Sequence, residues 1–107
     1  IIQLGVGIIE KLERFFTCDN DILLNFALLI YYNLSFDKNA RASIEKASLI
    51  PKFVHLLAQD SPNRMTSLNI LYMLSSEGGI RYTLAYTNCM DYVIKLILFP
   101  HPNISAV

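Results

Sequence analysis

The sequence predicts an all-α, right-handed superhelical solenoid, in which short helices stack as repeated units. Nine residues recur forty positions later without a gap: Leu28, Ile30, Tyr32, Leu34, Ser35, Arg41, Leu56, Pro62 and Asn63 reappear as Leu68, Ile70, Tyr72, Leu74, Ser75, Arg81, Leu96, Pro102 and Asn103. Apolar residues also align with apolar residues at this spacing. A period near forty is typical of armadillo and HEAT repeats, in which each unit buries its apolar face against the next.

The composition favours a packed protein with no net charge. Of the 107 residues, 53% are apolar and only four are Gly and four Pro, which argues against disorder. Nine basic and nine acidic residues balance, so no net charge favours nucleic acid or an anionic membrane. The two cysteines, Cys18 and Cys89, are too few for a disulfide framework and are expected to be free thiols.

The first two helices are expected over residues 1–16 and 21–36. The first carries an apolar stripe that includes Leu12, Phe15 and Phe16. A short polar break follows, in which Asp19 or Asn20 can cap the next helix. The second helix is apolar on nearly every side, which predicts that neighbouring helices cover most of it.

The next three helices are expected over residues 38–47, 48–59 and 64–76. Asp37 precedes the first of them. Pro51 lies in the first turn of the second, where the missing N–H costs nothing. The turn before the third helix contains Asp60, Pro62 and Asn63.

The same order begins again with helices expected over residues 80–88 and 90–99. The order of short, medium and long helices indicates a three-helix unit, so the sequence favours armadillo repeats over two-helix HEAT repeats. We expect about two and a half repeats: a partial one over 1–36, a full one over 37–76 and a partial one over 77–107. A new helix is expected near Asn103, and the chain is predicted to be a segment of a longer solenoid.

No residue pattern indicates catalysis. His55 and His101 lie far apart in the chain, with no Cys or carboxylate at metal-ligand spacing. Gly78 and Gly79 form a plain turn and not a phosphate-binding loop. The longest charge-free stretch, residues 22–36, is shorter than the ~20 residues that a membrane-spanning helix needs. We therefore expect no enzymatic activity, no cofactor or metal, and no membrane insertion.

The candidate binding residues lie at intervals of four on the third helices of the repeats, which line the concave surface of an armadillo array. They are Asn25, Leu29, Asn33, Met65, Asn69 and Met73. Asn side chains can bond both the N–H and the C=O of an extended partner, and Met adapts to varied partners. The alternative is that Asn33 and Asn69 only satisfy backbone groups between repeats.

The repeated Arg41 and Arg81 also have two interpretations. Each guanidinium can meet the unpaired carbonyls at the end of the preceding helix, or the two can form a line of positive charge on one surface. The first, structural interpretation is favoured.

Four short stretches resemble the kinesin-associated protein family. They are residues 21–25, 33–37, 49–52 and 85–89, which read DILLN, NLSFD, LIPK and AYTNC. They occur in the order and spacing of that family, and the similarity covers residues 9–98. The resemblance implies an armadillo-repeat adaptor that is the non-motor accessory subunit of heterotrimeric kinesin-II. Such subunits bind the C-terminal tails of the motor chains and link them to cargo, including intraflagellar transport particles.

The same resemblance implies a hetero-oligomer that is cytoplasmic, associated with the cytoskeleton and present in cilia. Two alternatives stay open: a general armadillo adaptor in adhesion or vesicle traffic, and a regulator that binds a small GTPase through its groove. An importin-α-like groove fits less well, because the chain has no Trp to pair with its Asn residues.

Overall fold

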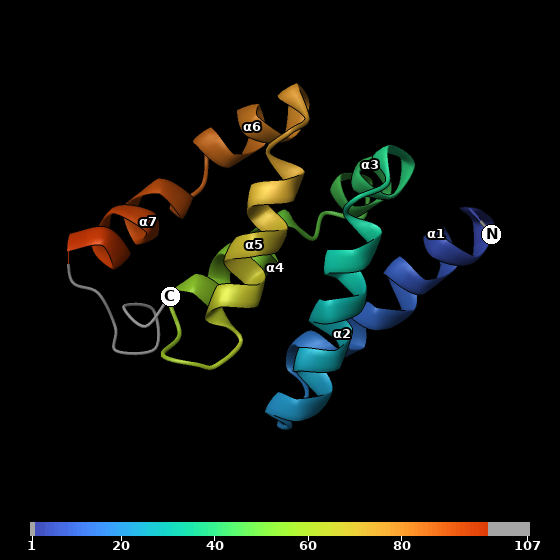
Figure 1. Ribbon diagram of the computed structural model, residues 1–107, viewed down its shortest axis with the longest axis horizontal. Coiled ribbons are helices and arrows are strands. Elements are labelled where there is room, and N and C mark those ends of the chain that lie inside the picture. Colours follow the sequence, from blue (N-terminus) through green and yellow to red (C-terminus); the bar gives the residue numbers. More distant parts are fainter. Residues whose placement is uncertain (1, 99–107) are drawn as a thin grey trace.

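The computed structural model describes residues 2–98, and every regular element in that range is a helix (Figure 1). The predicted all-α fold is confirmed. In chain order the elements are α1 (Ile2–Lys11), the 3-10 helix η1 (Leu12–Thr17), α2 (Asp21–Leu34), α3 (Lys38–Lys46), α4 (Ile50–Leu57), α5 (Arg64–Leu74), α6 (Gly78–Ala85) and α7 (Cys89–Leu98).

The first helix differs from the prediction because its winding changes at Leu12. The chain is α-helical to Lys11 and then continues as η1 to Thr17. A 3-10 helix aligns residues three apart, which here places Leu12 and Phe15 on the same side, toward the core. The helix expected near Asn103 lies outside the described residues.

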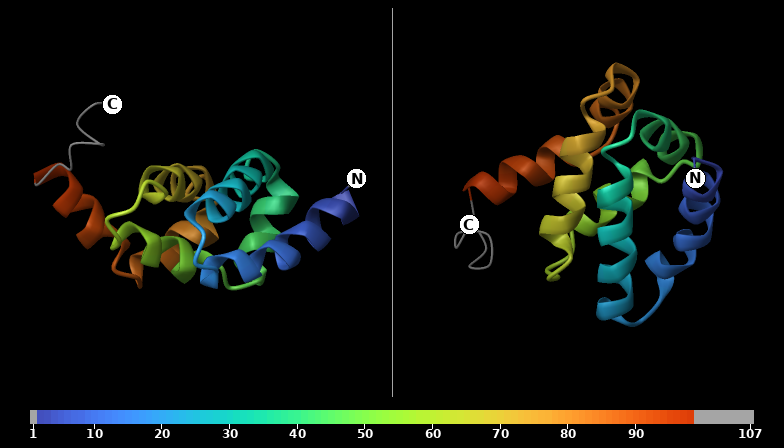
Figure 2. Two further views of the ribbon diagram at one scale, coloured as in Figure 1. Left: turned by 90° about the horizontal axis from the view of Figure 1, so that it is seen from below. Right: turned by 45° about the vertical axis from the view of Figure 1, so that its right-hand side comes forward.

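The helices follow one another in an armadillo-like order. Helices α3, α4 and α5 lie within residues 37–76, where the sequence predicts a full repeat, while α1, η1 and α2 precede them and α6 and α7 follow them. Helix α5 packs on α4 within the unit and on α2 of the preceding unit. As Figure 2 shows, α2 and α5 lie together on one side of a layer that contains α1, α4 and α7.

Three aromatic rings join the first two units in the core. Phe16, Tyr31 and Phe53 come from η1, α2 and α4, and their ring centroids lie 5.3–5.9 Å apart. Two of the three pairs, Phe16–Phe53 and Tyr31–Phe53, are edge-to-face, and such pairs add about 0.5–1.5 kcal/mol each beyond the apolar area that they bury. The Tyr31 hydroxyl donates a hydrogen bond of 2.8 Å to the carbonyl of Ile9. This bond ties α2 to α1.

Polar side chains fix where α2 and α3 begin. The side chain of Asn20 accepts hydrogen bonds from the N–H groups of Ile22 and Leu23, at 2.9 and 3.1 Å. Asp37 accepts one from the N–H of Ala40, at 2.9 Å. Both satisfy N–H groups that have no partner within the helix, and such caps stabilise a helix by about 1 kcal/mol.

Candidate protein-interaction surface

The six predicted binding residues lie on two helices that pack side by side. Asn25, Leu29 and Asn33 are on α2, and Met65, Asn69 and Met73 are on α5. Leu29, Asn33 and Asn69 are exposed, whereas Asn25, Met65 and Met73 are partly buried. We call these six residues the α2–α5 surface.

The amides of this surface do not join one repeat to the next. The Asn33 amide donates to the Leu29 carbonyl of its own helix, at 3.0 Å. Asn69 is exposed, and within residues 2–98 it makes no hydrogen bond to a neighbouring repeat. The side-chain carbonyl of Asn33 and the whole Asn69 amide are therefore open to a partner.

An apolar stripe on α2, which the sequence analysis did not single out, extends the surface. Ile22, Phe26 and Ile30 follow one another at intervals of four, and Ile22 and Phe26 are more than three-fifths exposed. Ile30 is 39% exposed, whereas Ile70, its equivalent on α5, is completely buried because α5 packs between α2 and α4. The sequence analysis expected neighbouring helices to cover most of residues 21–36. That expectation is wrong for α2, because half of its residues are exposed, the three of this stripe among them.

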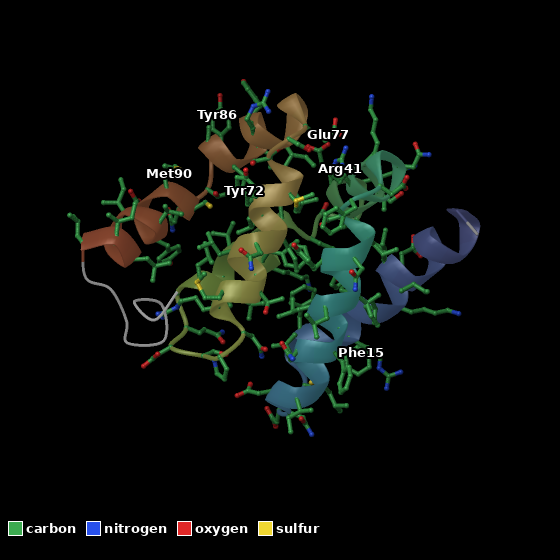
Figure 3. The ribbon with its side chains drawn as sticks, viewed as in Figure 1. Phe15, Arg41, Tyr72, Glu77, Tyr86 and Met90 are labelled. Carbon is green, nitrogen blue, oxygen red and sulfur yellow. The ribbon has the colours of Figure 1, made fainter. Side chains whose placement is uncertain are left out.

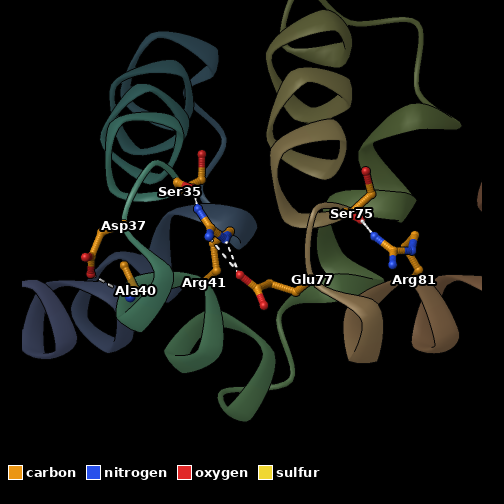
Figure 4. A network of polar contacts seen from close by, with 7 residues as sticks. All are labelled: Ser35, Asp37, Ala40, Arg41, Ser75, Glu77 and Arg81. Atoms are coloured by element: carbon orange, nitrogen blue, oxygen red, sulfur yellow. Dashed lines mark hydrogen bonds and ion pairs between the residues drawn. The ribbon is translucent and has the colours of Figure 1, made fainter.

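The two repeated arginines cap the ends of the third helices, so the structural interpretation is confirmed (Figure 4). Arg41 Nη1 donates to the Ser35 carbonyl at 2.9 Å, and Arg81 Nη1 donates to the Ser75 carbonyl at 2.7 Å. Both carbonyls follow the last helical residue, where helix geometry supplies no partner.

Arg41 also contacts the following repeat. Its Nε and Nη2 atoms donate to one carboxylate oxygen of Glu77, at 3.0 and 2.7 Å. Figure 3 shows the two side chains meeting between α3 and the start of α6. The pair is partly shielded from solvent, with the Arg41 side chain 14% exposed and that of Glu77 29% exposed.

Other contacts between elements come from residues that the sequence analysis treated as turn or helix residues only. The buried Asn63 amide donates to the Asp21 carbonyl at 3.2 Å, which links α5 to the start of α2. The Ser67 hydroxyl donates to the Phe53 carbonyl at 2.7 Å, which fixes α5 on α4. The sequence did give one indication of the Asn63 contact, because Asn63 recurs forty positions later as Asn103.

Two open clefts lie along α4, one beside η1 and one beside α7. One, of about 330 Å³, is lined by Phe16, Thr17, Pro51, Lys52, His55, Leu56 and Gln59. The other, of about 450 Å³, is lined by Leu57, Ala58, Arg64, Tyr92, Lys95 and Leu96. Lys52 and Tyr92 are forty residues apart, as are His55 and Lys95, so the clefts occupy equivalent places.

Within the described part of the chain, His, Cys, Asp and Glu side chains form no group of three or more that could hold a metal ion. The search for membrane spans, applied to the same residues, finds no helix with the length and hydropathy to cross a bilayer.

The comparisons with known proteins agree with the resemblance seen in the sequence. The family model described as "Kinesin-associated protein (KAP)" matches residues 3–104. Neither the curated proteins nor the solved structures give a match. The family match extends over nearly all of the helices described above. The chain therefore belongs to the kinesin-associated protein family.

Proposed function

We propose that this protein is a non-enzymatic adaptor subunit of heterotrimeric kinesin-II that binds the C-terminal tails of the motor chains and links them to cargo for intraflagellar transport. Membership of the kinesin-associated protein family supports a partnership with kinesin. The observation that carries the adaptor role is the α2–α5 surface, where exposed amides and apolar side chains lie on two parallel neighbouring helices.

Binding at this surface would use shape and hydrogen bonds alone. The Asn69 amide can pair with both a peptide N–H and a peptide C=O, and the side-chain carbonyl of Asn33 can accept from a further N–H, which suits an extended tail segment. Leu29 and Phe26, both exposed, offer apolar contacts beside them. Met65 and Met73 are unbranched and can adjust to the side chains of different partners.

The proposal places the chain within a larger assembly. The full repeat over 37–76 and the partial repeats over 1–36 and 77–107 would form part of a longer armadillo solenoid. Such a subunit would work as a hetero-oligomer in the cytoplasm, on the cytoskeleton and in cilia.

Co-purification of the tagged full-length protein from ciliated cells tests the function. We expect mass spectrometry to identify both motor chains of kinesin-II in near-equal amounts. Absence of both motor chains would contradict the kinesin-II assignment, and adhesion proteins or a small GTPase in their place would favour the corresponding alternative.

A pair of variants tests the surface separately. Asn33→Arg together with Asn69→Arg adds two bulky charges to the α2–α5 surface and should release the motor chains. Asn39→Arg makes the same change at an exposed position of α3 and should retain them. If both variants retain the motor chains, the tails bind elsewhere on the protein.

A further inference from the structure

One of the two clefts along α4 carries positive charge and has no acid among its lining residues. This cleft, of about 450 Å³, lies between α4 and α7, and we call it the α4–α7 cleft. Arg64, the first residue of α5, and Lys95, on α7, both line it. Its other lining residues are uncharged: Leu57, Ala58, Tyr92 and Leu96. Two cations therefore lie beside a largely apolar wall.

Arg64 has no partner within the part of the chain that the structure describes. Its Nε atom is buried and makes no hydrogen bond, and its guanidinium forms no ion pair with any residue of 2–98. A buried N–H without an acceptor is unfavourable, and native proteins leave few of them unpaired. Helix α5 offers no compensation, because its first turn has no acidic residue and its positive end repels a cation. This side chain thus lacks an anion.

The repeat does not account for Arg64 either. The residues forty positions before and after it are Leu24 and Ile104, which are both apolar. The repeated arginines Arg41 and Arg81 have a common structural role instead, as caps of the preceding helices. Stacking of the repeats therefore does not require a cation at position 64.

Lys95 adds a second charge that is also unbalanced. It is exposed, it forms no ion pair within residues 2–98, and its ammonium lies 5.8 Å from the centroid of the Tyr92 ring. An aromatic ring attracts a cation but does not cancel its charge. In the equivalent cleft beside η1, Lys52 pairs with Glu13 at 3.1 Å. The lysine of one cleft is thus paired with an acid, whereas both cations of the other are not.

We propose that the α4–α7 cleft binds an acidic peptide segment of a partner protein, in which an Asp or Glu lies next to an apolar side chain. Arg64 as a whole is only partly buried, so a carboxylate can reach its guanidinium and accept two of its N–H groups. Lys95 supplies the second positive charge. The apolar neighbour packs on Leu57 and Leu96.

Charge complementarity identifies this occupant. The chain has no net charge, so no broad field gathers nucleic acid or an anionic membrane around the cleft. A cleft that combines apolar walls with a few charged groups suits a ligand that has both characters close together, as neighbouring side chains of a peptide do. The cleft shares no residue with the α2–α5 surface, so the proposal does not rest on the binding of kinesin-II tails.

Selection from a phage-displayed library of random short peptides tests this on the full-length protein. Peptides are selected on the parent and then compared on Arg64→Gln together with Lys95→Gln. Those that the parent binds at least ~tenfold more tightly than this variant should be enriched in Asp or Glu beside an apolar residue. Arg14→Gln together with Lys38→Gln removes the same two charges at exposed positions outside the cleft, and it should bind these peptides as the parent does.

Charge reversal gives a second measure, since Arg64→Glu together with Lys95→Glu should select peptides rich in Lys or Arg. Circular dichroism checks that each variant stays folded. If replacement of Arg64 unfolds the protein, Lys95→Gln alone, at an exposed position, gives the same comparison. The proposal is overturned if no peptide distinguishes the parent from the Gln variants, or if the peptides that do are not acidic. It is also overturned if synthetic peptides bind only when phosphoserine replaces the Glu, because the cleft is then a phosphate site.

Discussion

The Tyr31 side chain is completely buried although it carries a hydroxyl. The hydroxyl is satisfied by the Ile9 carbonyl, and the ring packs against Phe16 and Phe53. Burial, and secondarily the negative charge of Glu13, raise the pKa of Tyr31 well above the ordinary tyrosine value. The folded state therefore holds the proton at a pH where the unfolded chain releases it.

This pKa shift predicts a loss of stability in alkali. The contribution of Tyr31 is fully present below the unfolded pKa, near ~10, and decreases as the pH rises from there toward the higher folded value. Tyr31→Phe should lower the free energy of unfolding by about 1–3 kcal/mol at neutral pH, because the Ile9 carbonyl loses its partner. The variant should also lose less stability than the parent between pH ~9 and ~11.5.

Denaturant titrations across that pH range measure the difference between variant and parent. Variant and parent must be compared because burial also raises the pKa of the Cys89 thiol, and both proteins contain this thiol. Tyr72→Phe is the control, since this side chain is three-quarters exposed and its removal should leave the parent curve unchanged. Equal alkaline slopes for Tyr31→Phe and the parent would contradict the assignment.

The contacts of single residues were predictable only in part. Recurrence of Arg41 and Arg81 at an identical place indicated a contact with the preceding helix end, and both carbonyl bonds confirm it. The Glu77 partner of Arg41 was not predictable from the sequence. Glu77 lies 36 positions away, and the residue forty positions before it, Asp37, has a different role as the N-cap of α3. Whether two such side chains meet depends on the angle between successive repeats, and a local sequence pattern does not determine that angle.

At the scale of the element, the end of α3 has a geometry that usually calls for glycine. Ser48 has a φ of 61°, in the left-handed region. Its N–H donates to the Glu45 carbonyl at 3.0 Å, and the Leu49 N–H donates to the Ile44 carbonyl at 3.4 Å. Leu49 and Ile44 are both completely buried. These are the two bonds and the apolar contact of a Schellman cap.

Ser48→Gly should therefore stabilise the protein. A side chain in the left-handed region costs about 1–2 kcal/mol, and glycine avoids this cost while it adds about 0.4–1 kcal/mol of unfolded-state entropy. The expected net gain is about 0.5–1 kcal/mol, measured by thermal or denaturant unfolding. Ser43→Gly, within α3, is the matched control and should destabilise by about 0.5–1 kcal/mol. A loss of stability for both would show that the cap does not strain Ser48.

The elements themselves were largely predictable. Apolar periodicity and polar breaks located each helix within one to three residues at most ends, and Pro51 lies in the first turn of α4 as expected. The 3-10 winding of η1 was not predictable, because residues 12–17 carry no Gly or Pro to interrupt a regular α-helix. Leu12 of this segment is buried in the core, and Phe15 and Phe16 pack against it.

At the scale of the whole molecule, most of the large exposed apolar residues lie on α2 and α7. Phe26 on α2 and Ile94 and Ile97 on α7 are exposed, while their counterparts in the middle of the row are partly or fully buried. Contiguous apolar surface of this kind promotes association when nothing covers it. The 107-residue chain alone should thus be helical but should associate as its concentration rises.

Charges placed on α7 should prevent this association without unfolding the chain. Ile94→Glu together with Ile97→Glu puts carboxylates at exposed positions, so helicity by circular dichroism should persist while sedimentation velocity shifts toward the monomer. Val54→Glu, at the buried position equivalent to Ile94, should cost about 3–5 kcal/mol and abolish the helical signal, because it places an unpaired charge in the core. If the parent chain stays monomeric at every concentration, the exposed apolar face of α7 does not drive association. Tolerance of Val54→Glu would show that the forty-residue equivalence of α4 and α7 does not describe their packing.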